Sequence, residues 1–369
     1  ALRSDFAHAH GDTLMVECSH DYLFFCDQFE KANLMLQASV DNAKKPIDHP
    51  DVRFLMKAPL NDGGTFCGVV DRAVKYGLVP MAAQPETFSS ENTSRMSRLV
   101  SSKLREFALE LRAMVADGKK AKAIEERKTE MLATVYHMLS MTLGEPVKSF
   151  SYAFRNSKGQ VVVEEKTYTP REFYDYTVGR DLSATSVMLM NDPRHPYHKT
   201  YEVEYDRHTY DGHNWRYLNL PAEEIAQIAI AQLKDGRKMY SSYDVGKQSD
   251  RSAGIADARL YDYASLMGTT FGMSKADRIA TFDSGSTHAM TLTAVDLDAE
   301  GKPLKWKVEN SWGAASGSEG CMIMTNEWWE EYMFRVVVDK QYVPDHLLKE
   351  YAQKPVMLSY DDPLFAEDE

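Results

Sequence analysis

Two polar side chains near the C-terminal end of the chain have the types needed to activate a nucleophile. His288 precedes an apolar stretch, and Asn310 ends a second one, directly before Ser311 and Trp312. An imidazole beside a thiol holds it as the reactive thiolate, because an isolated thiol is only a few per cent ionised near neutral pH. An asparagine carbonyl oxygen orients that imidazole without adding a full charge. The pair predicts cysteine-based catalysis, with the Trp312 indole shielding the Asn–His hydrogen bond from water.

A β-hairpin would bring these two side chains together. Residues 289–295 and 306–308 are apolar segments typical of strands, and residues 298–303 between them are rich in turn formers. Antiparallel pairing of these strands places His288 and Asn310 at the same end of the hairpin. Taken singly, each residue also fits a structural role, as a hydrogen-bonded histidine or as an asparagine that starts a turn. We favour the catalytic interpretation because the two occur together at one predicted hairpin end.

Short motifs along almost the whole chain extend this pattern. They lie at residues 19–25, 61–64, 75–80, 191–194, 244–247, 308–313 and 336–339. In this order they resemble the bleomycin hydrolase and aminopeptidase C family of cysteine peptidases, a branch of the papain superfamily. The resemblance implies an α+β, papain-like, two-lobed fold with a helical lobe, an antiparallel β lobe and a helical insertion subdomain. It also implies catalytic roles for His288 and Asn310.

The nucleophile is the missing member of the predicted site. The resembled family carries a glutamine and then a cysteine followed by an aromatic residue, and residues 1–10 contain neither. The resemblance implies that the nucleophile lies a few residues upstream of Ala1, on a helix of which residues 2–10 are the rear part. The sequence is therefore interpreted as lacking its natural start.

Cys67 is the alternative nucleophile within the sequence. It lies in the glycine-rich segment 63–68, and a helix starting near Val69 would place it at the positive end of a helix dipole. Against this role, the family usually has glutamine and tryptophan where this chain has Thr65 and Phe66, and no aromatic residue follows Cys67. The remaining cysteines lie in apolar segments typical of buried residues: Cys18, Cys26 and Cys321.

The hydrophobic pattern and the resemblance together divide the chain into five segments. Apolar residues recur every three or four positions over residues 94–118 and again up to Leu143, which predicts two antiparallel helices. A turn-rich, aromatic region follows, and strands dominate residues 238–340. The predicted segments are residues 1–90, the remainder of the helical lobe; 91–146, a helical insertion used in assembly; 147–220, a turn-rich connection; 221–345, the β-rich lobe; and 346–369, a C-terminal arm into the active-site cleft.

Four histidines in the turn-rich region raise the question of a metal site. They are His195, His198, His208 and His213. Their spacing includes no cysteine, and no helix is evident that would align the rings, so solvated or hydrogen-bonded loop histidines are favoured over metal ligands. Catalysis by a thiolate and His288 needs no metal and no organic cofactor.

Composition restricts the class of protein. The 369 residues are 43% hydrophobic and 27% charged, which is typical of a globular protein with substantial cores. No apolar run approaches the roughly 18 to 20 residues needed to span a bilayer. Four cysteines without CxxC spacing fit a reducing compartment, so a cytoplasmic location is predicted. The net charge of -12 disfavours nucleic-acid binding, which depends on neutralising phosphates.

These observations predict a thiol aminopeptidase that releases N-terminal residues from peptides through an acyl-enzyme. By resemblance, the terminal carboxylate of Glu369 meets the α-ammonium of the substrate, and the protein assembles as a homohexamer. Residues 361–364 match the family's ending motif, and residues 365–369 add a more acidic extension. Two alternatives stay open: a catalytically inactive scaffold if the protein truly starts at Ala1, and an acyltransferase in which an amine intercepts the acyl-enzyme.

Overall fold

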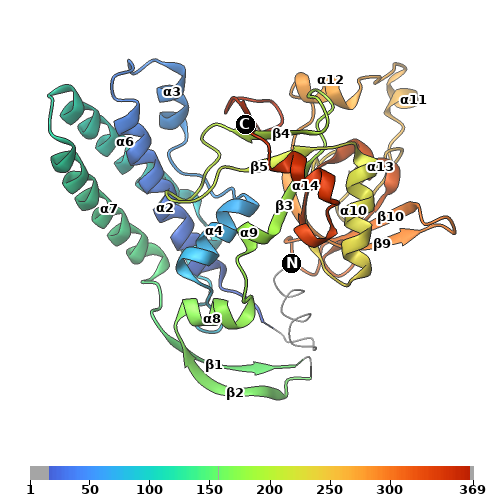
Figure 1. Cartoon of the computed structure of the whole chain (residues 1–369), viewed down its shortest axis with the longest axis horizontal. Coiled ribbons are helices and arrows are strands. Elements are labelled where there is room, and N and C mark those ends of the chain that lie inside the picture. The colour runs from blue at the N-terminus through green and yellow to red at the C-terminus, as the bar shows by residue number, and fades with distance from the viewer. Residues whose placement is uncertain (1–15, 157, 366–369) are drawn as a thin grey trace. The chain divides into compact units, whose positions relative to one another are not determined.

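Two compact units make up the protein. The computed structural model describes residues 16–156 and 158–365 (Figure 1). The described residues within 12–183 and 207–213 form a mainly helical unit, and those within 184–206 and 214–369 form a unit built around a sheet. We refer to them as the helical unit and the sheet unit.

Three long helices form the core of the helical unit. They are α2 (His20–Asp41), α6 (Ser94–Ala116) and α7 (Ala121–Leu143). The two predicted antiparallel helices are confirmed as α6 and α7, which run side by side in Figure 1. Most of the apolar positions in the predicted pattern are buried, including Val100, Leu104, Leu111, Met131, Val135 and Leu139, whereas Leu99 is 58% exposed. Burial of such a face supplies most of the stability of helices of this length.

Shorter elements complete the helical unit. They are α3 (Pro50–Lys57), α4 (Phe66–Tyr76), α5 (Phe88–Glu91), β1 (Phe150–Arg155), β2 (Val161–Tyr168), α8 (Pro170–Thr177) and α9 (Leu182–Thr185), which reaches the boundary between the units. Strands β1 and β2 pair antiparallel as a separate hairpin. At Gly77 (φ 83°) an added Cβ would lie 2.2 Å from the Pro170 carbonyl, so the end of α4 needs glycine there.

One large sheet organises the sheet unit. Its strands are β3 (Ser186–Met190), β4 (Lys199–Val203), β5 (Arg216–Asn219), β6 (Met239–Tyr243), β7 (Ser249–Asp250), β8 (Ile255–Ala256), β9 (His288–Leu297), β10 (Pro303–Glu309), β11 (Cys321–Thr325), β12 (Met333–Asp339) and β13 (Val356–Leu358). They lie in the order β13-β4-β5-β3-β12-β6-β9-β10-β11-β8-β7. Within residues 221–345 the predicted antiparallel arrangement is wrong for one pair, β11–β8, which is parallel. The parallel pairs β13–β4 and β3–β5 lie in segments predicted as a turn-rich connection and a C-terminal arm, so those segments contribute strands that were not predicted.

Helices of the sheet unit flank these strands. They are α10 (Ala222–Lys234), α11 (Tyr263–Met267), α12 (Lys275–Ala280), α13 (Asn326–Tyr332), the 3-10 helix η1 (Lys340–Tyr342) and α14 (Asp345–Tyr351). The core between α10 and the sheet is rich in aromatic residues, with Trp306 and Trp329 stacked at 4.7 Å between ring centroids. Across the described part of the chain, no helix is long and apolar enough to cross a membrane.

Candidate active site

His288 and Asn310 lie at one end of the hairpin formed by β9 and β10. His288 is the first residue of β9, and Asn310 directly follows the last residue of β10. The strands are antiparallel, with Glu309 opposite Thr291, so the predicted hairpin is confirmed. Buried residues on the two strands fix which face points to the core, among them Met290, Leu292, Trp306 and Val308. The local hydrophobic pattern is therefore what aligns the two polar side chains.

The two side chains form a direct hydrogen bond whose direction follows from its chemistry. His288 Nε2 lies 2.8 Å from Asn310 Oδ1, which also accepts a bond from the Ser311 backbone N–H at 2.7 Å. An amide oxygen is only an acceptor, so Nε2 carries the proton and donates it. In the neutral ring this leaves Nδ1 with an unshared electron pair. Nδ1 is the atom of this site able to take a proton from a thiol or to give one to a leaving amine.

The amide of Asn310 is held by its own loop. Its backbone N–H donates to the Gly320 carbonyl at 2.8 Å, and its side-chain Nδ2 lies 3.6 Å from the sulfur of Met322. These contacts join the beginning and end of the loop that connects β10 with β11. The Asn310 oxygen is therefore presented to His288 by a closed loop rather than by a free chain.

Trp312 packs on the imidazole as the sequence analysis predicted. The rings of His288 and Trp312 are stacked, with 4.8 Å between centroids and 25° between planes. Trp312 is half-buried, and its indole covers the ring that makes the hydrogen bond to Asn310. A cover of this kind limits competition from water for that bond.

Arg251 also packs on Trp312 and was missed by the sequence analysis. Its guanidinium carbon lies 3.4 Å from the centroid of a Trp312 ring. Arg251 belongs to the turn between β7 and β8, far from Trp312 in sequence. The pairing of β8 with β11 brings the two segments together, and a short parallel pair leaves no local signal in the sequence.

Of the three cysteines predicted to be buried, Cys26 is buried, whereas Cys18 and Cys321 are partly exposed, as is Cys67. Cys67 is the second residue of α4, which begins at Phe66 rather than near Val69 because Thr65 caps the helix and accepts a bond from Gly68 N–H at 3.1 Å. Cys67 belongs to the helical unit and His288 to the sheet unit. Cys26 is buried in α2, and burial raises the pKa of its thiol to about 12, so it is a poor nucleophile.

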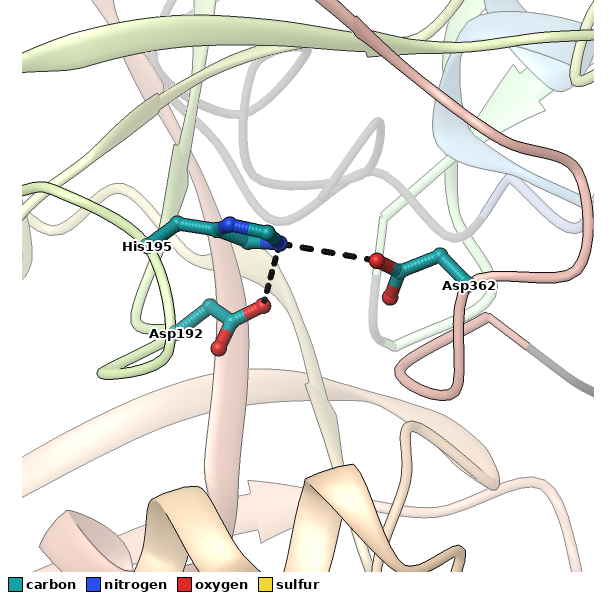
Figure 2. Close-up of side chains that lie close together, drawn as sticks. All are labelled: Asp192, His195 and Asp362. Atoms are coloured by element: carbon teal, nitrogen blue, oxygen red, sulfur yellow. Dashed lines mark hydrogen bonds and ion pairs between the residues drawn. The ribbon is translucent and has the colours of Figure 1, made fainter.

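A cluster of charged side chains lies elsewhere in the sheet unit. Figure 2 shows His195 between Asp192 and Asp362, with Nε2 at 3.7 Å and 3.5 Å from their carboxylates. Arg194 Nη2 lies 2.6 Å from an oxygen of each of the same two carboxylates. We call these four residues the carboxylate cluster. Because the guanidinium bridges the two acids and offsets part of their charge, the group has the character of an ion-pair network rather than a cation site.

The other predicted histidines have separate partners. His198 lies between Glu224 and Glu350 at 3.3 Å and 3.1 Å. His213 pairs with Asp71 at 3.0 Å, and burial lowers the pKa of His208 to about 3. His208 and His213 belong to the helical unit, unlike His195 and His198. The interpretation as hydrogen-bonded or ion-paired loop histidines therefore fits His195, His198 and His213, whereas His208 Nδ1 is buried without a hydrogen-bond partner among the described residues.

The C-terminal segment packs beside the residues that precede His288. The Ser286 backbone N–H donates to the Leu364 carbonyl at 3.3 Å, and Phe365 stacks on Tyr217 with 5.5 Å between centroids. Asp362 anchors the same segment through Arg194 in the carboxylate cluster. Glu369, predicted to meet the substrate's α-ammonium, lies outside the described residues.

Comparisons with known proteins give a consistent result. The model of the Peptidase C1-like family matches residues 1–365. Aminopeptidase C of Lactobacillus delbrueckii subsp. lactis is 37% identical over 358 residues, covering 95% of this chain and 78% of that protein. Human bleomycin hydrolase is also 37% identical over 358 residues, with the same two coverages.

A solved structure agrees over nearly the whole chain. The crystal structure of PepW from Lactobacillus rhamnosis HN001 superposes with a TM-score of 0.93 at 36% identity. The match covers 99% of this chain and 82% of PepW. Similarity of this extent applies to the mixed helix-and-sheet architecture as a whole rather than to one motif.

Proposed function

The chain belongs to the Peptidase C1-like family, and on this premise we propose that it is a cysteine aminopeptidase that releases N-terminal residues from peptides. The observation that carries the proposal is the 2.8 Å bond between His288 Nε2 and Asn310 Oδ1. This bond sets the tautomer that leaves Nδ1 free for proton transfer. Relatives described as aminopeptidase C and bleomycin hydrolase support the same chemistry.

His288 has three successive roles in the proposed reaction. It takes the proton of the cysteine thiol, and the resulting thiolate adds to the carbonyl carbon of the first peptide bond. The tetrahedral oxyanion collapses, and the departing amine takes the proton from His288, which leaves an acyl-enzyme. His288 then removes a proton from water, whose oxygen attacks the thioester, and the thiolate leaves as the amino acid is released. Asn310 orients the ring throughout, and Trp312 shields their bond.

The identity of the thiol is part of the proposal. Resemblance predicts a cysteine upstream of Ala1, and Cys67 is the alternative within the sequence. No separate metal or organic cofactor takes part in the steps above. The two alternatives from the sequence, an inactive scaffold and an acyltransferase, are not favoured by any contact of the described residues.

The proposed fold details and oligomeric assembly rest on the same family resemblance. The finer proposal is a papain-like, two-lobed fold in which residues 91–146 form an insertion used in assembly of a homohexamer. The pairing of α6 with α7 supports a separate helical element over that range. A cytoplasmic location is proposed because the four cysteines lack the paired spacing of disulfide scaffolds.

Restriction to free N-termini is proposed to come from the C-terminal arm. An exopeptidase needs a fixed group that recognises the α-ammonium, and the terminal carboxylate of Glu369 is the proposed one. The contact of Leu364 with Ser286, two residues before His288, supports an arm that runs toward this region of the sheet unit. The carboxylate cluster would then anchor the arm through Asp362.

Three assays on the reduced, purified protein test the proposal. A fluorogenic aminoacyl amide with a free amine should be hydrolysed, whereas the same compound with an acetylated amine should not. Brief alkylation with iodoacetamide should abolish hydrolysis, and peptide mapping of the alkylated protein would identify the reactive cysteine. An added acceptor amine should not divert the acyl group. Hydrolysis that resists complete alkylation would refute the cysteine mechanism, and absence of hydrolysis in the protein carrying its natural N-terminus would refute peptidase activity.

A further inference from the structure

Arg251 lies on the same indole that covers His288. Its guanidinium carbon is 3.4 Å from the Trp312 ring centroid, and the His288 ring is 4.8 Å from Trp312. A guanidinium stacked by its face keeps its edge N–H donors available, in the planar fork that matches a carboxylate. Across residues 16–156 and 158–365, no acidic side chain forms an ion pair with Arg251, which is exposed.

The turn that carries Arg251 is held in place by its own hydrogen bonds. Asp250 closes it, since its backbone carbonyl accepts from Gly254 N–H and its side chain accepts from Ala253 N–H, each at 2.9 Å. The Gly254 carbonyl then accepts from the backbone N–H of Ile323 in β11 at 2.8 Å. The Asp250 carboxylate is thus occupied within the turn, and the turn is fixed to the strand that follows the Trp312 loop.

Two glycines let this turn and the Trp312 loop meet backbone to backbone. A Cβ at Gly254 would lie 2.8 Å from the Gly317 Cα and 2.7 Å from the Cys321 carbonyl oxygen. A Cβ at Gly317 would lie 2.4 Å from the same oxygen. Larger residues would separate the two segments and lift Arg251 from Trp312. The guanidinium is therefore preorganised, which lowers the entropy lost when it binds an anion.

We propose that Arg251 binds a carboxylate in the leaving part of the substrate and so determines specificity. The inference rests on the proposed function, because the amine that leaves is the one that takes its proton from His288. The carboxylate is the C-terminal α-carboxylate of a dipeptide or the side chain of an acidic second residue. The chemical class of preferred substrate is thus a short peptide with negative charge next to the scissile bond.

The length of the leaving residue is compatible with simultaneous contacts to His288 and Arg251. In an amino acid the nitrogen and the carboxyl carbon are about 2.5 Å apart, and each hydrogen bond adds about 3 Å. A leaving residue bonded to His288 at its nitrogen and to Arg251 at its carboxylate therefore spans roughly 8 to 9 Å. The imidazole centroid lies 4.8 Å and the guanidinium carbon 3.4 Å from a ring of the same indole, so the two groups cannot be farther apart than these two distances combined, which does not exceed that span.

Paired substrates that differ only in charge test the proposal. The first pair is leucyl-alanine and leucyl-alanine amide, which reports on the α-carboxylate; the second is leucyl-aspartate amide and leucyl-asparagine amide, which reports on the side chain. We expect the wild-type kcat/KM to favour the acid by about tenfold in at least one pair, since a charge-assisted fork is lost with the amide. The pair that shows the preference identifies the source of the carboxylate.

Variants of Arg251 separate recognition from support of the indole. Arg251→Gln should bring the acid-to-amide ratio of kcat/KM close to one, and Arg251→Lys should keep part of the preference for the acid. Arg251→Glu should instead favour a substrate of opposite charge, leucyl-lysine amide, over both acids. Arg259→Gln is the matched control, because Arg259 is exposed in the same unit and pairs with Glu327 at 3.0 Å. The control should leave the ratio unchanged. Equal losses on acid and amide in Arg251→Gln would overturn the proposal, as would a wild-type ratio near one in both pairs.

A binding measurement distinguishes failure of the inference from failure of the proposed function. If a neutral fluorogenic aminoacyl amide is not hydrolysed, the proposed function fails while Arg251 remains testable. Calorimetric titration with a leucyl-alanine analogue whose amide is reduced to an amine, and with the C-terminal amide of that analogue, needs no turnover. Tighter binding of the acid that is lost in Arg251→Gln supports the assignment, and equal binding of the two compounds overturns it.

Discussion

The His288–Asn310 pair and the carboxylate cluster both contain a histidine beside polar partners, yet the partners differ in charge: a neutral amide in the pair, and two acids with a guanidinium in the cluster. In the pair, one ring nitrogen donates to a neutral amide and the other keeps an unshared electron pair. In the cluster, Arg194 forms short contacts with both of the acids that Figure 2 shows beside His195. Asp192 is fully buried, and Arg194 is the cation bound to its carboxylate. The neutral amide orients one ring for proton transfer, whereas the charged groups of the cluster join two segments of the sheet unit.

Replacing each histidine in turn gives the largest contrast. His288→Ala should lower kcat/KM on a neutral fluorogenic aminoacyl amide by about 10³- to 10⁴-fold, because general acid–base transfer and thiolate stabilisation are lost together. His195→Gln should retain kcat/KM within about twofold, since its partners are already bridged by Arg194. Thermal melts of both variants verify that they are folded. A comparable loss in His195→Gln would mean that the cluster takes part in catalysis.

Breaking the cluster should instead reduce stability. Arg194→Met leaves the carboxylates of Asp192 and Asp362 close together without their shared cation, which costs about 3–5 kcal/mol for a buried pair. Chemical denaturation followed by tryptophan fluorescence measures the change in unfolding free energy. The matched control, Arg259→Met, removes an exposed pair with Glu327 and should cost about 0–1 kcal/mol. If the two variants lose the same stability, the cluster is not the anchor described above.

The sequence specified the His288–Asn310 pair well because both strands of its hairpin are adjacent in the chain. The apolar runs at 289–295 and 306–308 and the turn at 298–303 were sufficient to predict two antiparallel strands and a common end for the pair. The amphipathic helices α6 and α7 were predictable for the same reason, since their signal is local.

Features that depend on distant segments could not be predicted. Strands β3, β4 and β5 lie in the region predicted to be turn-rich. Near-complete burial of β3 and β5 removes the alternating pattern that reveals strands. The contact of Arg251 with Trp312 requires the β8–β11 pairing and the close approach at Gly254. The bridge from Arg194 to Asp362 likewise joins residues at very different positions in the chain.

Within the described chain, Asp206 has a buried carboxylate oxygen but no guanidinium bridge of the kind found in the carboxylate cluster, and we expect it to make stability depend on pH. Asp206 Oδ2 is buried without a hydrogen-bond partner among the described residues, and burial raises the pKa of Asp206 to about 7, opposed by the more distant charge of Arg335. Because the folded-state pKa is above the unfolded one, the folded protein binds the extra proton between about pH 4 and pH 7. Stability should therefore fall as pH rises through this window.

Asp206→Asn removes that dependence. The free energy of unfolding of the variant, relative to that of wild type, should rise by about 1–3 kcal/mol from pH 5 to pH 8, given about 1.4 kcal/mol per pKa unit. Denaturation curves at pH 5, 6.5 and 8 measure the difference. Asp296→Asn, at an exposed position of β9, should show a constant difference from wild type over the same range. A constant difference for Asp206→Asn as well would refute the raised pKa.

The smallest expected effect concerns Trp312, whose indole covers the His288–Asn310 bond. This ring contact has no equivalent among the four residues of the carboxylate cluster. Trp312→Leu admits water to a bond whose net contribution is about 1 kcal/mol, so kcat/KM on the neutral fluorogenic substrate should fall roughly fivefold. Trp312→Phe keeps an aromatic face on the imidazole and should recover most of that loss. The leaving part of the substrate must be neutral because Arg251, which is proposed to bind a carboxylate there, also packs on Trp312. If leucine and phenylalanine variants were equally impaired, the indole would matter through its size or its N–H rather than as a ring stacked on His288.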